Sequence, residues 1–275
     1  MKLGVAYIVF DGIELLEHSI RQIRPHVDHI NVIYQNHSWF GTPISKEDLI
    51  KLKSLTSARL IDELTLFNDF SPIRVKNHQG IMKAKGYERT KRQLGLSITL
   101  NRGCTHYLCM DVDEFYKSEE FAKAKSEIIS KGYDQTAVRL INYVNVPIVH
   151  RGYDSIRVPF ICRIDRSTKM TPSFFVKCDP TRGLTSASKN KHEFAPSIIT
   201  MHHMETVRKN LTLKYDSTTR AVFARARTSE LVDSIKNVNE KSSNFSFKKI
   251  IFPGLNSIKL IQCENIFNIP YQKWK

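Results

Sequence analysis

The first 115 residues alternate between short apolar runs and segments with helical spacing, and this order restricts the fold more than any other feature. Residues 3–10 and 29–35 are almost continuously apolar, which is typical of strands buried on both faces. Further strands are predicted at 60–67 and 105–111, and helices fall between them at 13–23, 44–55 and 77–101. Strands that alternate with helices predict a parallel sheet covered by helices.

Local signals place several helix ends. Pro25 stops the first helical pattern, and Ser45 with Asp48 forms a capping box for the second. A short helix at 118–130 is expected after the fourth strand, with Ser118 as its N-cap and Gly132 as its C-terminal stop.

The pattern changes after residue 133. Short strands at 136–149, 158–164, 173–178 and 197–203 are separated by Pro, Gly and Ser, which predicts a mixed-sheet extension of the same domain. Residues 204–238 indicate a helix broken near 216–218, and the last 35 residues are irregular and basic.

The chain carries a formal net charge of +15, and the excess is concentrated in its second half. Residues 141–275 hold 22 Lys and Arg against 10 Asp and Glu, whereas residues 1–70 hold 7 against 9. Such a field favours a polyanionic partner, although it also provides solubility. The five cysteines have no CxxC spacing, and the N-terminus has no signal-peptide pattern, so a cytoplasmic protein without an integral membrane segment is expected.

An acidic motif, "DVDEFY", follows the fourth predicted strand. Asp111 and Asp113 are two residues apart, so on a strand they would present two carboxylates on one side. The carboxyl ends of such strands are where open α/β sheets bind ligands, and oxygen ligands suit Mg²⁺ or Mn²⁺. The alternative is that both aspartates cap the next helix or face water.

Other candidate residues are more ambiguous. His202 and His203 end a predicted strand and would point in opposite directions, so one could bind metal while the other packs, or both could be structural. Basic residues between 83 and 92 could contact a diphosphate or form a solvated helix face. A carboxylate base is also needed to deprotonate an acceptor alcohol. Its candidates are Asp154, Asp179 and Glu193. P-loop, dinucleotide-binding and hydrolase-elbow motifs are absent from the sequence.

Together, "ERTKRQLGLSITLNRGCTHYLCMDVDEF" and "ITMHHMETVRKN" resemble GT-A-fold glycosyltransferases of the family 2-like group, over residues 3–215. The resemblance implies a Rossmann-like α/β fold, with a mostly parallel mixed sheet flanked by helices and a basic helical C-terminal extension. Residues 1–203 would form the catalytic domain, of which 1–115 bind the nucleotide sugar and 116–203 the acceptor. Residues 204–275 would form the extension.

The resemblance also implies roles for single residues. Asp113 would be the principal ligand of Mn²⁺ or Mg²⁺, and Asp111 would contact the ribose or the metal. His203 or His202 would be a third metal ligand. The residues implied to bind the nucleoside-diphosphate sugar are Tyr7, Gln35, Arg92 and Asp111.

The activity implied is metal-dependent transfer of a sugar from a nucleoside-diphosphate sugar to an acceptor hydroxyl. The basic second half favours a polyanionic acceptor, such as a hydroxymethylated base in DNA. The late aromatic residues that could stack on that base are Phe245, Phe247, Tyr271 and Trp274. Alternative acceptors are a surface polysaccharide, lipopolysaccharide or a lipid-linked sugar. Other functions are nucleic-acid binding without catalysis and nucleotidyl transfer.

One substitution is expected to separate catalysis from stability. If Asp113 is an exposed carboxylate at the end of a strand, Asp113→Ala should abolish turnover and leave the fold intact.

Overall fold

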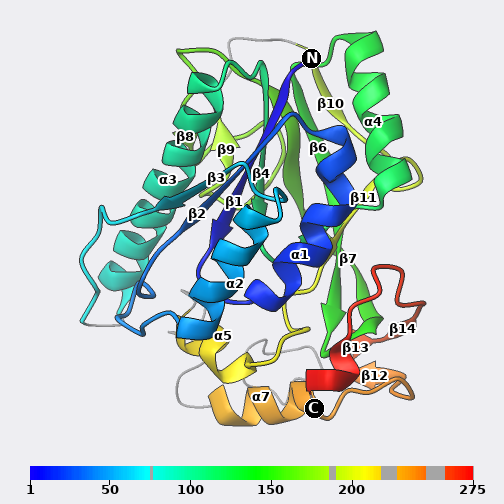
Figure 1. Cartoon of the computed structure of the whole chain (residues 1–275). Coiled ribbons are helices and arrows are strands. Elements are labelled where there is room, and N and C mark those ends of the chain that lie inside the picture. Colours follow the sequence, from blue (N-terminus) through cyan, green and yellow to red (C-terminus); the bar gives the residue numbers. More distant parts are fainter. Residues whose placement is uncertain (75–76, 186–189, 218–227, 246–257, 275) are drawn as a thin grey trace.

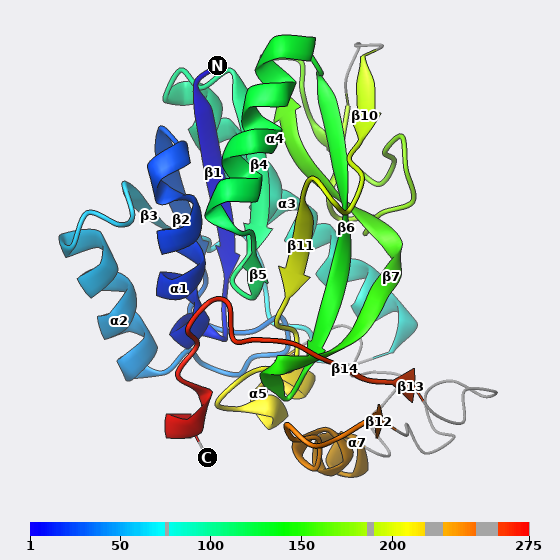
Figure 2. The same cartoon turned by 90° about the vertical axis from the view of Figure 1, so that its right-hand side faces the viewer.

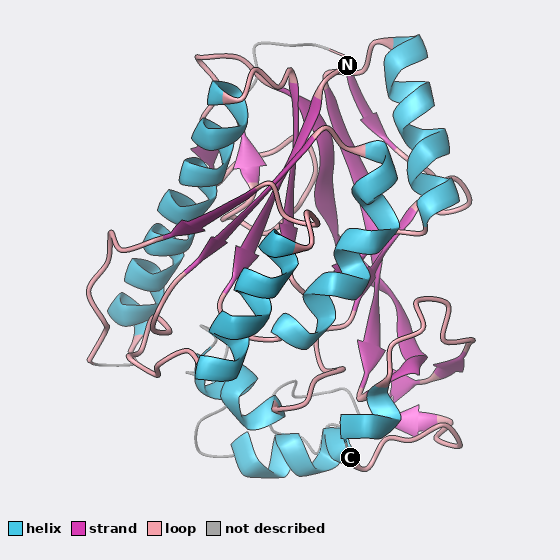
Figure 3. Ribbon diagram, in the orientation of Figure 1, coloured by secondary structure: helices cyan, strands magenta, loops and turns pink. Residues whose placement is uncertain are grey.

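The central feature of the molecule is a ten-stranded mixed sheet with helices on both faces (Figures 1 and 3). The computed structural model describes residues 1–74, 77–185, 190–217, 228–245 and 258–274. The strand order is β3-β2-β1-β4-β7-β6-β11-β5, with β10 paired to β6 and β14 to β7. The predicted α/β class, with helices flanking a mostly parallel sheet, is confirmed and is consistent with a GT-A-like Rossmann arrangement.

The first four long strands run parallel, as their alternation with helices predicts. Neighbouring strands pair in the order β3-β2-β1-β4, and every pair is parallel. Their bounds are β1 Leu3–Val9, β2 His29–Tyr34, β3 Glu63–Leu66 and β4 His106–Asp111. Because the strands are parallel, their carboxyl ends meet at one edge, which is the lower edge in Figure 1.

Helices bury both faces of these strands. On β1, Val5 and Tyr7 belong to the core cluster shared with α1, whereas Ala6 and Ile8 belong to the cluster shared with α3. Helices α1, α2 and α4 therefore cover one face and α3 covers the other (Figures 1 and 2). Their bounds are α1 Ile13–Ile23, α2 Lys46–Ser57, α3 His78–Asn101 and α4 Ser118–Lys131, with a short 3-10 helix at Arg24–His26.

The predicted helix caps are partly right. The Ser45 hydroxyl accepts a hydrogen bond from the Asp48 amide, so Ser45 is the N-cap of α2. Gly132 ends α4 in the left-handed conformation, as expected. Ser118 is not an N-cap, since Lys117 precedes α4 and the Ser118 hydroxyl is bonded to His26 instead.

The second half extends the sheet with antiparallel strands. The long pair β6 and β7 lies beside β4, and β11 then pairs parallel to β6. The predicted strand at 173–178 is wrong, because this segment makes only an isolated bridge between Arg157 and Cys178. The strands of this half are β5 Glu114–Phe115, β6 Gln135–Val144, β7 Val146–Arg163, β8 Met170–Thr171, β9 Gly183–Leu184, β10 Lys191–Glu193 and β11 Thr200–His203.

The C-terminal extension lies at the carboxyl ends of the parallel strands (Figures 1 and 2). The predicted helix starts later than expected, at Leu211 and not near residue 204, and residues 218–227 lie outside the described part of the chain. Buried side chains of the extension share one cluster with Phe115 and Tyr143, so the two regions pack together. The extension contains α5 Leu211–Ser217, α7 Thr228–Lys236, β12 Asn244–Phe245, β13 Ile258–Lys259, β14 Ile261–Gln262 and a 3-10 helix Tyr271–Trp274.

The described helices include none with both the length and the apolar character needed to span a bilayer. All five cysteines are free thiols.

Candidate functional site

A cavity of about 220 Å³ opens at the carboxyl ends of the parallel strands. Val9 at the end of β1, Gln35 after β2 and Asp111 at the end of β4 line one side of it. The other side is lined by β6, β7, β11 and the start of the extension, including Asn142, Asp154 and Lys214. This is the edge at which open α/β sheets bind ligands, so the cavity is the candidate active site.

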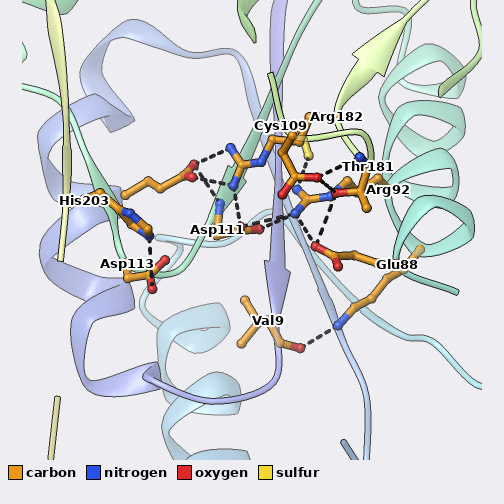
Figure 4. Close-up of polar contacts among 12 residues, drawn as sticks. Val9, Glu88, Arg92, Cys109, Asp111, Asp113, Thr181, Arg182 and His203 are labelled. Atoms are coloured by element: carbon orange, nitrogen blue, oxygen red, sulfur yellow. Dashed lines mark hydrogen bonds and ion pairs between the residues drawn. The ribbon is translucent and has the colours of Figure 1, made fainter. Parts of the chain in front are cut away.

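The carboxylate of Asp111 lies among arginines. Arg92 Nη2 is 2.9 Å from Asp111 Oδ1 and also donates to Glu88 Oε1 at 2.7 Å. Arg182 pairs with Asp111 and donates through Nη1 to Glu114 Oε2 at 2.9 Å (Figure 4). These five residues are the Asp111 cluster.

Arg92 of the Asp111 cluster does not reach the cavity, so it cannot contact a ligand there directly. The Arg92 side chain is fully buried beneath Asp111 and does not line the cavity, so the predicted diphosphate contact is replaced by a positioning contact with Asp111. Burial opposes charge on Asp111, but Arg182 and Arg92 outweigh it and hold the pKa of Asp111 below its ordinary value. Burial raises the pKa of Glu114 despite its contact with Arg182.

Asp113 is surrounded by a different set of cations. Arg208 donates to Asp113 Oδ2, Lys214 Nζ lies 3.2 Å from the same oxygen, and His203 Nε2 lies 3.6 Å from it. Burial alone would raise the pKa of Asp113, but Lys214, Arg208 and His203 hold it well below the ordinary range. These four residues are the Asp113 cluster.

The two aspartates do not share one ligand position. Strand β4 ends at Asp111 and a turn follows, so the rule that residues two apart face the same side no longer applies at Asp113. Asp113 is also not exposed, since 2% of its side chain is accessible. Figure 4 shows Asp111 directed toward the arginines and Asp113 directed toward His203.

The adjacent histidines point in opposite directions. His202 packs against Phe267 and its Nδ1 lies 3.0 Å from the Tyr143 hydroxyl; burial lowers the pKa of His202 to about 3. His202 is therefore a neutral core residue away from the cavity. His203 lines the cavity, and its Nδ1 lies 2.8 Å from Asn142 Oδ1.

An aromatic and amide-lined end of the cavity lies beside α3. Lys91 Nζ donates to the Val9 carbonyl at 2.7 Å and to Gln35 Oε1 at 2.9 Å, and it lies 5.8 Å from the centre of the Trp39 ring. Burial lowers the pKa of Lys91 to about 7. Tyr7, by contrast, is fully buried and its hydroxyl bonds to Ser19, so the predicted contact with a donor is not possible there.

The three predicted bases are separated by the fold. Asp154 lines the cavity, and its Oδ2 accepts from Asn142 Nδ2 at 2.9 Å. Asp179 also lines it, but its Oδ1 accepts from both the amide and the hydroxyl of Thr181 at 2.8 Å. Glu193 lies on edge strand β10, pairs with Arg157 and does not line the cavity.

The predicted metal site does not fit the donor set. Asp113 Oδ2 is already bound by Arg208 and Lys214, Asp111 is bound by Arg92 and Arg182, and His202 points away. Within the described ranges, no group of three or more His, Cys, Asp and Glu side chains could hold a metal ion.

Two of the four predicted base-stacking aromatics are described, and both pack into the core of the extension. Tyr271 is buried, and Trp274 is partly buried against the same cluster. Phe247 and the side chain of Phe245 lie outside the described part of the chain.

Several residues of the site had no signal in the sequence. Arg182 follows an irregular segment, and Arg208 and Lys214 follow the predicted strand that ends at His203. Lys91 belongs to the basic residues between 83 and 92 that were predicted as diphosphate contacts or a solvated face, but its contacts with Val9 and Gln35 were not predicted.

The chain has only slight likeness to known proteins. No protein-family model and no curated protein matches it. Among solved structures, it is similar to S. aureus TarS in complex with UDP-GlcNAc, with 14% identity and a TM-score of 0.36 over 52% of this chain and 35% of that one. It is also similar to TarS in complex with UDP, with 10% identity and a TM-score of 0.37 over 52% and 36%.

A longer alignment is found with mannose-1-phosphate geranyltransferase from Thermus thermophilus, at 10% identity and a TM-score of 0.31 over 88% of this chain and 66% of that one. The chain spans about a third of those two TarS chains. Likeness of this degree does not place the chain in a family, so the interpretation of the site rests on its own residues.

Proposed function

We propose that the chain is a glycosyltransferase that moves a sugar from a nucleoside-diphosphate sugar to an acceptor hydroxyl. The observation that carries the proposal is one cavity with three chemically distinct parts. Trp39 and Gln35 line an aromatic and amide end, basic side chains including Arg182 line the centre, and Asp154 lies on the β7 side. The aromatic end suits a planar nucleobase, the basic centre suits a diphosphate, and the carboxylate suits an acceptor hydroxyl.

The donor would lie along the carboxyl ends of β1, β2 and β4. The Trp39 ring suits a nucleobase, because an aromatic side chain can stack on it, and Gln35 supports this end through its hydrogen bonds with Lys91 and the His37 carbonyl. The basic side chains at the centre suit the diphosphate, because guanidinium and ammonium groups donate hydrogen bonds to phosphate oxygens.

Asp154 is the residue we assign as the general base. Asp179 lies among the charges of Arg92 and Arg182 and accepts hydrogen bonds from Thr181, and Glu193 lies outside the cavity. Burial opposes charge on Asp154, but hydrogen bonds from Ile156 and Asn142, together with Arg151, hold its pKa below the ordinary value, so it is ionised at neutral pH.

In the reaction, Asp154 takes the proton of the acceptor hydroxyl while that oxygen bonds to the anomeric carbon of the sugar. The bond between this carbon and the diphosphate oxygen breaks, and the nucleoside diphosphate leaves with the bonding electrons. Positive side chains around the diphosphate offset the charge that develops on it. None of these steps depends on the Mn²⁺ or Mg²⁺ that the sequence predicts.

The positive charge of the second half and an exposed aromatic residue support a polyanionic acceptor. Tyr153 is 52% exposed on β7, and the Arg139 guanidinium lies 5.9 Å from its ring centre. Such a pair suits a flat, anionic acceptor, so the proposed acceptor remains a polyanion, with hydroxymethylated DNA tested first and anionic polysaccharide or lipid-linked sugar as the alternatives.

The test is a panel of nucleotide sugars incubated with each acceptor and read by mass change of the acceptor and by the nucleotide product. Release of a nucleoside diphosphate with a gain of one sugar supports the proposal, whereas release of pyrophosphate indicates nucleotidyl transfer. Absence of both over the whole panel would reject an enzymatic role.

The assignment of Asp154 as the general base is tested with one variant at Asp154 and a control variant at Glu193. Asp154→Asn should lower turnover by about 10²–10⁴-fold, the usual worth of a general base, without loss of donor binding. Glu193→Gln should leave turnover unchanged, because Glu193 does not line the cavity. Equal losses in both variants would contradict the assignment.

A further inference from the structure

The residue predicted to bind metal is already neutralised by protein cations. Arg208 and Lys214 both contact Oδ2 of Asp113, one of the two carboxylate oxygens that could bind a metal ion. Both come from the segment after β11, about 100 positions further along the chain. This segment therefore brings two positive charges to the position where a divalent ion was expected.

The two cations differ in their carboxylate partners, since Arg208 pairs with both Asp113 and Asp11. Arg182 pairs with Asp111 and Glu114, and Arg92 with Asp111 and Glu88. Lys214, in contrast, has Asp113 as its only ion-pair partner within the described ranges, and it shares that carboxylate with Arg208.

Accessibility separates the two cations. The Lys214 side chain is 20% exposed, whereas that of Arg208 is 2% exposed, and both line the cavity. Arg208 Nη1 is held further by Asp11, whose Oδ2 lies 3.3 Å away. Lys214 can therefore turn to a ligand with the smaller rearrangement, while Arg208 provides a fixed charge behind it.

The Arg208 guanidinium group lies against Gly12, where a larger residue would collide with it. Gly12 precedes α1 with φ of 72°, and a Cβ atom built there would lie 2.0 Å from Arg208 Nη1. Only a residue without a side chain allows this approach, so the position of Arg208 is built into the turn after β1.

We propose that Arg208 and Lys214 bind the diphosphate of the donor, and that Asp113 is their counter-ion in the donor-free protein and not a metal ligand. The inference rests on the proposed function, because it assigns the same cavity to a nucleoside diphosphate. Two cationic side chains carry the charge of one divalent ion, and guanidinium and ammonium groups both bind phosphate oxygens.

Donor binding then requires an exchange of partners. The cavity of about 220 Å³ is smaller than the roughly 300–1,000 Å³ usual for small-molecule sites, and we expect lining side chains such as Lys214 to move when a nucleotide binds. Phosphate oxygens replace the Asp113 carboxylate as acceptors for Lys214, and no covalent bond changes. Because α5 carries Lys214, donor binding is coupled to the position of the extension.

The decisive experiment is calorimetric binding of UDP, GDP, ADP and CDP to the full-length protein, in EDTA and in Mn²⁺. We expect the nucleotide that binds to do so in EDTA, with Mn²⁺ changing its Kd by less than about threefold. Lys214→Gln and Arg208→Lys should each weaken binding by about tenfold or more, as expected for loss of a charged contact.

Lys209→Gln is the matched control, because Lys209 lies in the same segment, is 49% exposed and is 3.9 Å from Glu47. Its Kd should equal that of the wild type. For Asp113→Asn the two hypotheses predict opposite changes in affinity. If Asp113 is a counter-ion, its removal should preserve or tighten nucleotide binding; if Asp113 is a metal ligand, its removal should weaken binding. Circular dichroism checks that each variant is folded.

The outcomes separate this inference from the proposed function. Binding that requires Mn²⁺ and is unchanged by Lys214→Gln would overturn the inference and leave a nucleotide-binding enzyme. Failure of the wild-type protein to bind any nucleoside diphosphate in either condition would overturn both.

Discussion

Asp111 and Asp113 are two positions apart, but the fold uses them differently. The Asp111 cluster is built from α3, β4, β5 and the residue that precedes β9, and each of its arginines has two carboxylate partners. The Asp113 cluster combines His203 of β11 with Arg208 and Lys214 of the extension, and both of these cations contact one oxygen of Asp113. Arg208 also pairs with Asp11, whereas Lys214 has no second carboxylate among the described residues, so Lys214 is the cation that a ligand can most easily take over.

The largest expected effect is a difference in stability between two isosteric substitutions. Asp113→Asn should lower the free energy of unfolding by about 3–5 kcal/mol, because it removes the carboxylate that Arg208, Lys214 and His203 share and leaves Arg208 only Asp11. Asp111→Asn should cost only about 1–2 kcal/mol, since Arg92 and Arg182 keep Glu88 and Glu114. Urea denaturation followed by circular dichroism measures both.

This result would replace the expectation that Asp113 is exposed and dispensable for folding. Equal losses in the two variants would remove the distinction between the clusters. A larger loss for Asp111→Asn would reverse it.

The next effect concerns a cation beside the Asp111 cluster. Burial lowers the pKa of Lys91 to about 7, whereas in the unfolded chain the ordinary value near 10.4 applies. Between these values the unfolded state binds the additional proton, so the stability contributed by Lys91 increases as the pH rises. Relative to Lys91→Met, the wild type should gain about 2–3 kcal/mol between pH 7 and pH 9.

The comparison with Lys91→Met cancels the titration of groups that both proteins share. Urea unfolding at several pH values gives the difference directly. A stability difference that stays constant from pH 7 to pH 9 would show that Lys91 is solvated, and that the Asp111 side of the cavity is wetter than the structure indicates.

The parallel half of the fold was predictable because its signals are local. The apolar run at 3–10, the N-cap at Ser45 and the glycine at 132 each act within a few residues, and each appears in the structure as expected. The strand end at Asp111 was also predicted, and it locates the cavity. The late helix was predicted too early because residues 204–210 make tertiary contacts, such as that of Arg208 with Asp113, and are not helical.

The partners of the two aspartates were not predictable, because these contacts are not local. Arg182, Arg208 and Lys214 reach their aspartates across 71, 95 and 101 positions. In a chain with 42 Lys and Arg residues, one basic residue at such a distance carries no signal of its own. The burial of Asp113 was missed for the same reason, since the segment that covers it comes from the extension.

The smallest expected effect isolates the contact between Gly12 and Arg208. Gly12 and Gly132 both have left-handed backbone angles, with φ of 72° and 63°, but only at Gly12 would a Cβ atom meet another group. Gly12→Ala and Gly132→Ala should each cost about 1–2 kcal/mol from backbone strain. Only Gly12→Ala should also weaken nucleoside-diphosphate binding, because its Cβ atom displaces the Arg208 guanidinium group from its position at the cavity. Equal nucleotide affinity in the two variants would mean that the position of Arg208 does not affect donor binding. The cations of the Asp113 cluster would then be as unavailable to a ligand as those of the Asp111 cluster.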